Sequence, residues 1–384
     1  MERLTAGEIT TGVLVQFTPV WIGLVVILTL SYLFRKKLGI YGKLFASPIG
    51  VAGLILVLFW ILTAIFADLI ATMDPLTQIS GMKNKKPGWP VSGAEEQWYL
   101  LGGDNLARDV FSRMVYGSRM VIAIAPAATI MAFMVGVTLG LPAGFYGGML
   151  DTVLSFIANL VLAFPVILLF FLLVTPEIRA TGLPLAMAGV LFLFPIIFFV
   201  MLFYSRFSEQ PTKLAIILII TLVFGGWAYS GLAFNKDPLG VFYMDPNLLN
   251  IFVAVVFVNS PTVFRIVRGL TLDIQTRDYV AAAQTRGERP WYVMLWEVLP
   301  NARGPLIVDF CLRIGYTTIL LGTLGFFGLG VSPESPDWGT TINEGRRLLA
   351  VYPHPALPPT LALMSLVLGL NMLADGLREE SLKD

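Results

Sequence analysis

The sequence predicts an all-α membrane protein that crosses the bilayer about nine times. Hydrophobic residues make up 56% of the 384-residue chain and charged residues 13%, about half the charged share of a typical soluble protein. The mean hydropathy is +0.78. A chain of this length cannot hide so much apolar surface in a water-soluble core, so most of it must face lipid or other buried helices.

Nine segments have the roughly 20 apolar residues that a spanning helix needs. They are residues 13–34, 50–71, 118–143, 151–175, 184–204, 214–234, 249–269, 305–330 and 357–377. Proline and glycine inside these segments are compatible with membrane helices. We expect an N-terminal helix and basic loop (1–45), a first core helix and long loop (46–117), and a core (118–384) with an inserted helix pair at about 176–248.

Lysine and arginine in short loops predict the orientation. Arg35, Lys36, Lys37 and Lys43 follow the first segment and should be cytoplasmic. Alternation from there places the C-terminus inside and the N-terminus outside.

Residues 72–117 form the longest stretch between apolar segments, on the side opposite the cytoplasm. Its first part is rich in proline, glycine and charge, as loops are. Leu106, Val110 and Met114 then follow at helical spacing, with Asp104 or Asn105 as the N-cap. This pattern predicts a short helix that lies along the membrane surface or contacts a partner.

No catalytic or metal-binding pattern is present in the sequence. There is no G-x-x-x-x-G-K-[ST] phosphate loop, so the chain does not bind ATP by that route. One histidine and one cysteine do not make a metal site or an intrachain disulfide. We expect His354 to be solvated in a loop and Cys311 to be a small packing residue. The net charge of +1 gives no reason to expect nucleic acid. We therefore expect no enzyme activity and no cofactor.

Two charged residues fall inside an apolar segment. Asp309 and Arg313 are four residues apart, which places them on one face of a helix. An ionisable residue within the membrane is a functional-site hypothesis. The alternative is an internal ion pair near the cytoplasmic end of the helix.

Residues 277–304, hereafter the 277–304 loop, form a polar segment between two long apolar runs. A short helix is expected over Asp278–Arg286, because the alanines Ala281–Ala283 favour helix strongly. Gly287 should break this helix, since glycine adopts backbone conformations that other residues resist.

A second helical piece, residues 291–298, should follow and end at Pro300 and Gly304. The resulting shape suits a docking element for a soluble partner, an amphipathic helix on anionic lipid, or an ordered connection. The small alanine side chains and the glycine bend favour docking.

The loop resembles the cytoplasmic signature of permease subunits in binding-protein-dependent ABC importers. That signature reads Glu-Ala-Ala, three residues, Gly, eleven residues and Leu-Pro. Here Ala281–Ala283, Gly287 and Leu299–Pro300 carry it at the same spacing. Ala281 stands in place of the Glu, and Glu297 stands where an apolar residue or His is usual.

Further blocks resemble the dipeptide, oligopeptide and nickel branch of this family. They are residues 101–119, 143–154, 162–165, 324–346 and 371–379. The family's usual six-helix subunit lacks the first apolar segment and the pair near 184–234, which identifies these as additional helices.

The resemblance implies a type I importer permease core in a bacterial or archaeal plasma (inner) membrane, with peptides or a similar small solute as substrate. It implies a heterodimer with a second permease subunit, two ATP-binding subunits and an extracytoplasmic substrate-binding protein. The coupling residues implied are Asp278, Ala281, Ala282, Ala283, Gly287, Glu297, Leu299 and Pro300.

Two other classes compete with this interpretation. An ion-coupled secondary transporter predicts charges in several spans and inverted halves, whereas the sequence shows one charge pair and no evident duplication. A structural membrane scaffold would not need the bent alanine–glycine loop.

Overall fold

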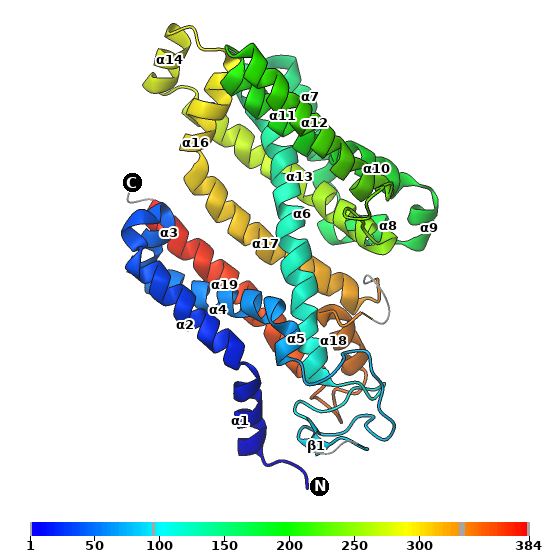
Figure 1. Cartoon of the computed structure of the whole chain (residues 1–384). Coiled ribbons are helices and arrows are strands. Elements are labelled where there is room, and N and C mark those ends of the chain that lie inside the picture. The colour runs from blue at the N-terminus through cyan, green and yellow to red at the C-terminus, as the bar shows by residue number, and fades with distance from the viewer. Residues whose placement is uncertain (1, 94–96, 330–334, 382–384) are drawn as a thin grey trace. The chain divides into compact units, whose positions relative to one another are not determined.

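A computed structural model describes residues 2–93, 97–329 and 335–381. The chain divides into two compact units, and the order of its elements can be followed in Figure 1. Unit 1 comprises residues 1–126 and 311–384, and unit 2 comprises residues 127–310. The boundaries fall inside α6 (Val110–Tyr146) and α17 (Arg303–Phe326), so both helices contribute to both units.

In the described residues, seven helices are long and apolar enough to span a membrane, and nine do so if each bent pair is one span. The seven are α4 (Pro48–Ile65), α6, α10 with α11 (Leu183–Leu191 and Leu193–Phe207), α12 (Pro211–Phe234), α13 (Pro246–Ile274), α17 and α19 (Leu357–Ser381). The predicted all-α membrane fold is confirmed.

Two of the predicted spans are bent, which the sequence analysis did not foresee. The predicted segment 13–34 corresponds to α1 (Ala6–Gln16) and α2 (Thr18–Leu33), which meet at 52°. Segment 151–175 corresponds to α7 (Gly148–Leu162) and α8 (Val166–Val174), which meet at 83°.

Proline accounts for the position of both bends. Pro19 and Pro165 stand at the starts of α2 and α8 and supply no backbone N–H to the preceding turn. At the first bend the Thr18 hydroxyl donates to the Val15 carbonyl at 2.6 Å and partly replaces the missing bond.

The predicted surface helix near residue 106 is wrong. α6 begins at Val110 and continues for 37 residues, about 55 Å, well beyond the roughly 30 Å of a hydrocarbon core. Asp104 does not cap it but accepts from the backbone N–H groups of Leu106 and Arg108, closing a turn. Asp109 takes the capping role and accepts from the Ser112 N–H at 2.9 Å.

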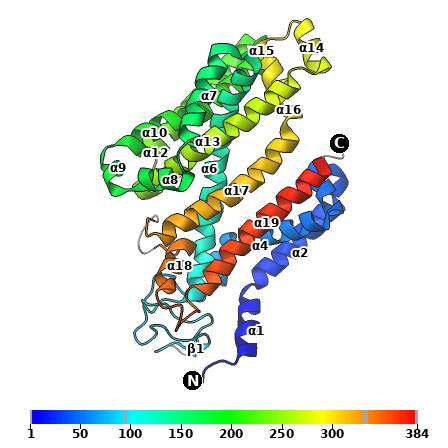
Figure 2. The same cartoon turned by 180° about the vertical axis from the view of Figure 1, so that it is seen from behind.

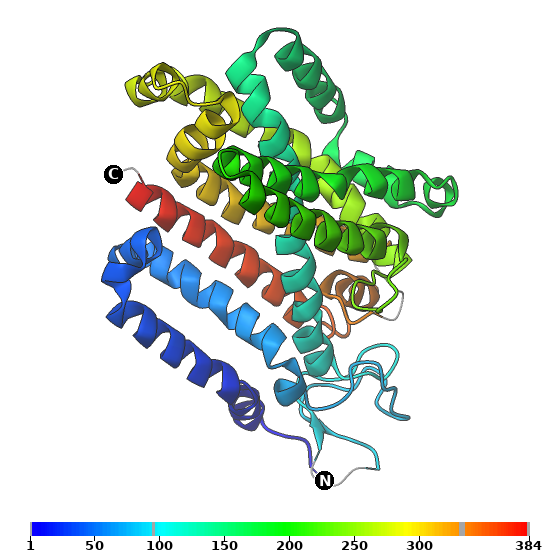
Figure 3. The ribbon, with the colours of Figure 1, turned by 45° about the horizontal axis from the view of Figure 1, so that its top comes forward.

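In unit 1, α4 and α19 lie side by side (Figures 1 and 3) and touch through glycines. A Cβ on Gly53 would lie 2.7 Å from the Gly369 carbonyl oxygen, and one on Gly376 would lie 2.4 Å from the Cα of Gly50. Such close approach of backbones is characteristic of membrane helix pairs. The other elements of unit 1 are η1 (Arg35–Lys37), α3 (Gly39–Lys43), η2 (Leu44–Ala46), α5 (Ala67–Ile70), the antiparallel strands β1 (Trp89–Pro90) and β2 (Trp98–Tyr99), and α18 (Trp338–Arg346).

In unit 2, α6 packs on α13 in the same manner. Gly136, Gly140 and Gly144, each four residues apart, face Val263, Val267 and Thr271 so closely that a Cβ would clash. The remaining elements are α9 (Pro176–Ala180), α14 (Asp278–Thr285), α15 (Pro290–Tyr292), the π-helix η3 (Val293–Val298) and α16 (Leu299–Asn301). Figure 2 shows α14 to α16 following one end of α13.

Candidate functional site: the 277–304 loop

The loop has the predicted order of helix, bend and helix. α14 covers Asp278–Thr285, and Asp278 lies in its first turn, where a negative charge favours the helix dipole. Gly287 then adopts φ +82°, a left-handed conformation that is strained for other residues. The space around Gly287 is open, so this backbone conformation is the reason for a glycine there.

The second helical piece does not end where the sequence analysis placed its end. Pro300 lies inside α16 and Gly304 inside α17, and Ala302 alone separates these helices. Pro300 follows almost directly on the helical turn η3, so the chain is helical on both sides of this proline. The preceding turn, η3, is a π-helix, a feature frequent at functional sites.

α14 has an inner and an outer face. Val280 and Ala283 are fully buried in an apolar cluster that includes residues of α6, α13 and the second helical piece. Ala281 and Ala282 are exposed. The prediction that all three alanines present one docking surface is therefore wrong for Ala283, because successive helical residues point about 100° apart.

We define the outer face of α14 by Asp278, Ala281, Ala282 and Thr285. All four are exposed, and their spacing places them on one side of the helix. The face is small and nearly free of charge, with Asp278 at its beginning and Arg286 just beyond its end.

Glu297 has a structural role within the loop. Its carboxylate accepts from the Arg286 guanidinium at 3.3 Å, while its carbonyl accepts from the Asn301 side chain at 2.6 Å. Glu297 therefore connects the end of α14 to the second helical piece, which accounts for a charged residue at this position. A second ion pair, Arg277 with Asp273 at 3.0 Å, raises the pKa of Arg277 through its hydrogen bond.

Leu299 and Pro300 line an open apolar hollow of about 390 Å³ beside the loop. Phe133 and Phe310 contribute its aromatic wall and contact each other edge to face, with ring centroids 5.4 Å apart. Leu299 is half-buried, whereas Pro300 is exposed.

Asp309 and Arg313 both belong to α17, as predicted, on one side of the helix. Asp309 is half-buried and Arg313 is buried. Neither is an isolated charge.

Unit 1 contains a cluster of charges that the sequence analysis missed. The buried charge cluster consists of Asp104, Arg108, Arg113 and Glu344. Arg108 pairs with Asp104 at 2.7 Å and with Glu344, and Arg113 lies 3.4 Å from Glu344 and 3.7 Å from Asp104. Burial raises the pKa of Glu344, although both arginines act to lower it.

Hints of this cluster are weak in the sequence. Asp104, Arg108 and Arg113 fall in the 101–119 block, but Glu344 lies more than two hundred residues away. His354 lies in a loop, as predicted, but it is not fully solvated. It is half-buried, and its Nε2 lies 3.1 Å from the Gly103 carbonyl oxygen.

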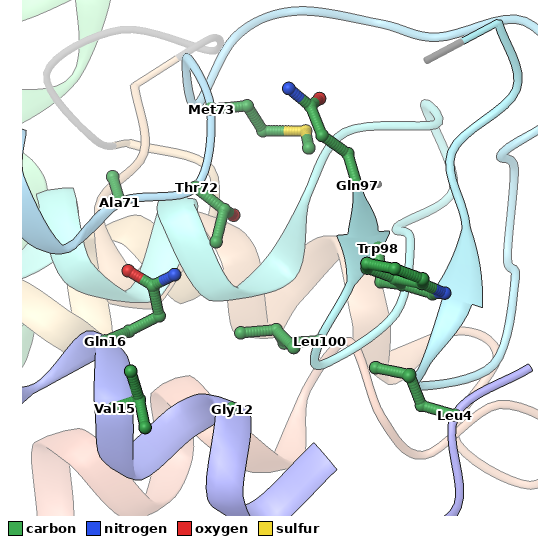
Figure 4. A pocket seen from close by; sticks show the side chains of 10 residues that line it. All are labelled: Leu4, Gly12, Val15, Gln16, Ala71, Thr72, Met73, Gln97, Trp98 and Leu100. Carbon is green, nitrogen blue, oxygen red and sulfur yellow. The ribbon is translucent and has the colours of Figure 1, made fainter. Parts of the chain in front are cut away.

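A pocket of about 500 Å³ lies beside α1 in unit 1 (Figure 4). Leu4, Val15, Leu100 and Trp98 form apolar walls, and Gln16 and Gln97 bring side-chain amides to it. No charged side chain lines it among the described residues. It is a neutral, partly apolar hollow in unit 1, whereas the 277–304 loop belongs to unit 2.

Comparison with known proteins agrees with this architecture. Residues 210–379 match the family described as binding-protein-dependent transport system inner membrane component, and residues 39–87 match the N-terminal membrane domain of oligopeptide transport permease C. Together these matches cover more than half of the chain.

Relatives align over most of the sequence. A dipeptide transport system permease protein of Alkalihalophilus pseudofirmus is 28% identical, over 88% of this chain and 87% of its own length. A glutathione transport system permease protein of Pectobacterium atrosepticum is 29% identical, over 73% and 71%. A dipeptide permease of Haemophilus influenzae is 28% identical, over 85% and 88%.

The fold and these matches define a multi-pass inner-membrane permease rather than an enzyme. The chain belongs to the family of permease subunits of binding-protein-dependent ABC importers, in its dipeptide and oligopeptide branch, and serves as the transmembrane permease of an ATP-driven importer.

Proposed function

We propose that this permease forms half of a translocation path for peptides or a similar small solute, and that the outer face of α14 docks on a separate ATPase subunit. A second permease subunit, two ATP-binding subunits and an extracytoplasmic binding protein complete the complex. The names of the dipeptide and glutathione relatives support the substrate class.

The observation that carries the docking proposal is that α14 is buried on one side and exposed on the other. Val280 and Ala283 anchor one side in the core of unit 2, while Ala281 and Ala282 remain exposed on the other. A short helix held in this way presents a fixed surface without bulky side chains, which the groove of another protein can approach closely.

The connection to α17 supports a role in transmitting motion. From Pro290 to Phe326 the chain is helical except at Ala302, and Glu297 ties this path to the end of α14. A displacement of α14 would therefore be transmitted to a membrane-spanning helix rather than absorbed by a flexible connection.

The orientation that this role requires agrees with the positive-inside rule. The 277–304 loop, the basic turn η1 and the C-terminus are placed in the cytoplasm, and the N-terminus outside. Residues 72–109, hereafter the 72–109 connection, join α5 to α6. In this orientation the connection faces the binding protein.

Site-directed crosslinking tests the docking proposal. The native cysteine is first removed by Cys311→Ala, and single cysteines are introduced by Ala282→Cys or Thr285→Cys. Both should crosslink to an ATPase subunit in the assembled complex, whereas Ala283→Cys, on the buried side, should not. Absence of crosslinking from both outer positions in an intact complex would refute the docking.

Uptake into proteoliposomes tests the transport class. We expect dipeptide uptake to require ATP and the binding protein. Uptake driven by an ion gradient without ATP would instead favour the secondary transporter. Asp309→Asn extends this test to the charge pair in α17, because normal transport at normal expression would exclude Asp309 from the substrate path.

A further inference from the structure

The additional helices α10 to α12 contact the 277–304 loop at one specific place. The last turn of α11 contains Tyr204, Ser205 and Arg206, and each of these residues interacts with the loop. All of these residues belong to unit 2.

The central contact is a hydrogen bond between two side chains. The Trp296 indole N–H donates to the Ser205 hydroxyl at 3.0 Å. Ser205 is buried, and its own hydroxyl proton is directed to the Leu202 carbonyl at 2.8 Å. The Ser205 oxygen is therefore held in place as an acceptor for Trp296.

Two weaker contacts surround this bond. The Arg206 guanidinium lies over the Trp296 ring, 5.1 Å from its centroid, within the range of a cation–π interaction. Arg289 donates to the Tyr204 hydroxyl at 3.4 Å. Trp296 belongs to η3, the π-helical turn that also contains Glu297.

Apolar packing extends the contact along α11, in the direction of its N-terminus. Phe198, Met201 and Leu202 of α11 pack against the same apolar cluster that buries Val280 and Ala283 of α14. The end of α11 therefore shares one core with the inner face of α14.

Elsewhere these helices contribute little to the protein interior. In an 18-residue apolar window of each span, the share of buried residues is 17% in Leu183–Phe207 and 6% in α12, compared with 78% in α13. These helices also pack on α13 through α10 and the adjoining Phe192, whose ring stacks on Phe252. The hydrogen bonds and the cation–π contact described above are made at the loop.

Open space lies next to the contact. A polar pocket of about 300 Å³ separates the α11–α12 turn from Gly287–Tyr292. Trp296 is therefore held against α11 beside this pocket, which also borders the bend at Gly287.

We propose that the end of α11 is a brace that positions the loop through Trp296, so that Ser205 and Trp296 are positioning residues for coupling ATP hydrolysis to transport. This inference rests on the proposed docking of α14. Loss of the brace should let the loop shift relative to α17, so that ATPase closure moves the membrane helices less effectively.

The test compares the number of ATP molecules hydrolysed per solute transported, in proteoliposomes with the complete complex. Trp296→Phe keeps the ring and removes the N–H donor. Because a net hydrogen bond is equivalent to about a fivefold change in an equilibrium, we expect this ratio to rise by about fivefold. Ser205→Ala should have the same effect, and Ser205→Thr, which keeps a hydroxyl acceptor, should restore the ratio.

Trp227→Phe is the matched control. Trp227 lies in α12 and donates to Asp237 at 2.6 Å, away from the loop. This variant should leave the ratio unchanged, which separates a general loosening of the helix pair from loss of the brace.

The outcomes distinguish the brace from the docking. Crosslinking from Ala282→Cys with an unchanged ratio in Trp296→Phe would overturn the brace alone. Loss of transport and ATP hydrolysis in parallel would also overturn it, because positioning predicts uncoupling. Absence of the crosslink would refute the docking itself.

Discussion

The buried charge cluster of unit 1 and the 277–304 loop of unit 2 both join arginines to carboxylates, but they differ in burial. Arg113 and Asp104 are 0% and 2% exposed, whereas Arg286 and Glu297 are 56% and 25% exposed. Buried ion pairs are costly to break because one partner is left as an uncompensated charge. Exposed pairs contribute little. The cluster therefore fixes structure, and the loop leaves its charges available to a partner.

The largest expected effect follows from breaking the cluster. Arg113→Ala would leave Glu344 and Asp104 with one arginine between them. We expect a loss of about 3–5 kcal/mol in the free energy of unfolding, measured by denaturation of the purified protein in detergent. Arg286→Ala, the corresponding change in the loop, should cost about 1 kcal/mol or less. Equal losses for the two variants would contradict the contrast in burial.

The two faces of α14 allow a sharper comparison within the loop. Ala283→Asp places a carboxylate in the apolar cluster and should destabilise the protein by several kcal/mol, about the cost of burying an unpaired polar group. Ala282→Asp is exposed and should leave stability nearly unchanged while it weakens ATPase binding. Thermal unfolding and co-purification of the ATPase measure the two effects. If Ala282→Asp lowered stability as much as Ala283→Asp, the assigned faces would be wrong.

Replacement of Gly287 should have a smaller effect on stability. Alanine fits the open space but not the φ of +82°, so Gly287→Ala should cost about 1 kcal/mol in stability and reduce coupled transport. Gly240, with φ +65° and open surroundings, lies outside the loop. Gly240→Ala should cost a similar amount of stability but leave transport normal. If Gly287→Ala and Gly240→Ala reduced transport equally, backbone strain alone, and not the bend at Gly287, would be responsible for the loss of transport.

Much of the fold could be predicted because membrane helices are encoded locally. Apolar length locates the nine segments, and proline and glycine locate their interruptions. The bend angles at Phe17 and Pro165 and the continuation of α6 to Val110 depend on packing, so they could not be predicted in this way. The helical part of the loop was equally clear from Ala281–Ala283.

The parts of the site that escaped prediction involve residues distant in sequence. Nothing local indicates that Glu344 lies with Arg108, that Glu297 pairs with Arg286, or that Ser205 accepts from Trp296. The burial of Ala283 could have been inferred from its spacing of three residues from Val280, a helical repeat of apolar positions. The small size of the three alanines suggested one surface, although their consecutive order places them on different sides.

The pH dependence of the 72–109 connection should be the smallest effect. His354 is half-buried against Gly102 and Gly103. Burial, together with the nearby charges of Arg3 and Lys86, lowers the pKa of His354 below 6.5. The folded protein therefore favours the neutral imidazole, and unfolding takes up a proton at low pH. The contribution of His354 to stability is present above pH 6.5 and decreases as the pH falls below that value.

Replacement of this residue isolates its contribution. His354→Gln can still donate to the Gly103 carbonyl but does not titrate, so its unfolding temperature should fall less than that of the wild type when the pH is lowered from about 8 to about 5. Limited proteolysis of the 72–109 connection should show the same difference locally. The loop in unit 2 provides the contrast, because its ion pairs are exposed and co-purification of the ATPase should change little over this range. Equal pH slopes for the wild type and His354→Gln would show that groups other than His354 dominate the acid response of unit 1.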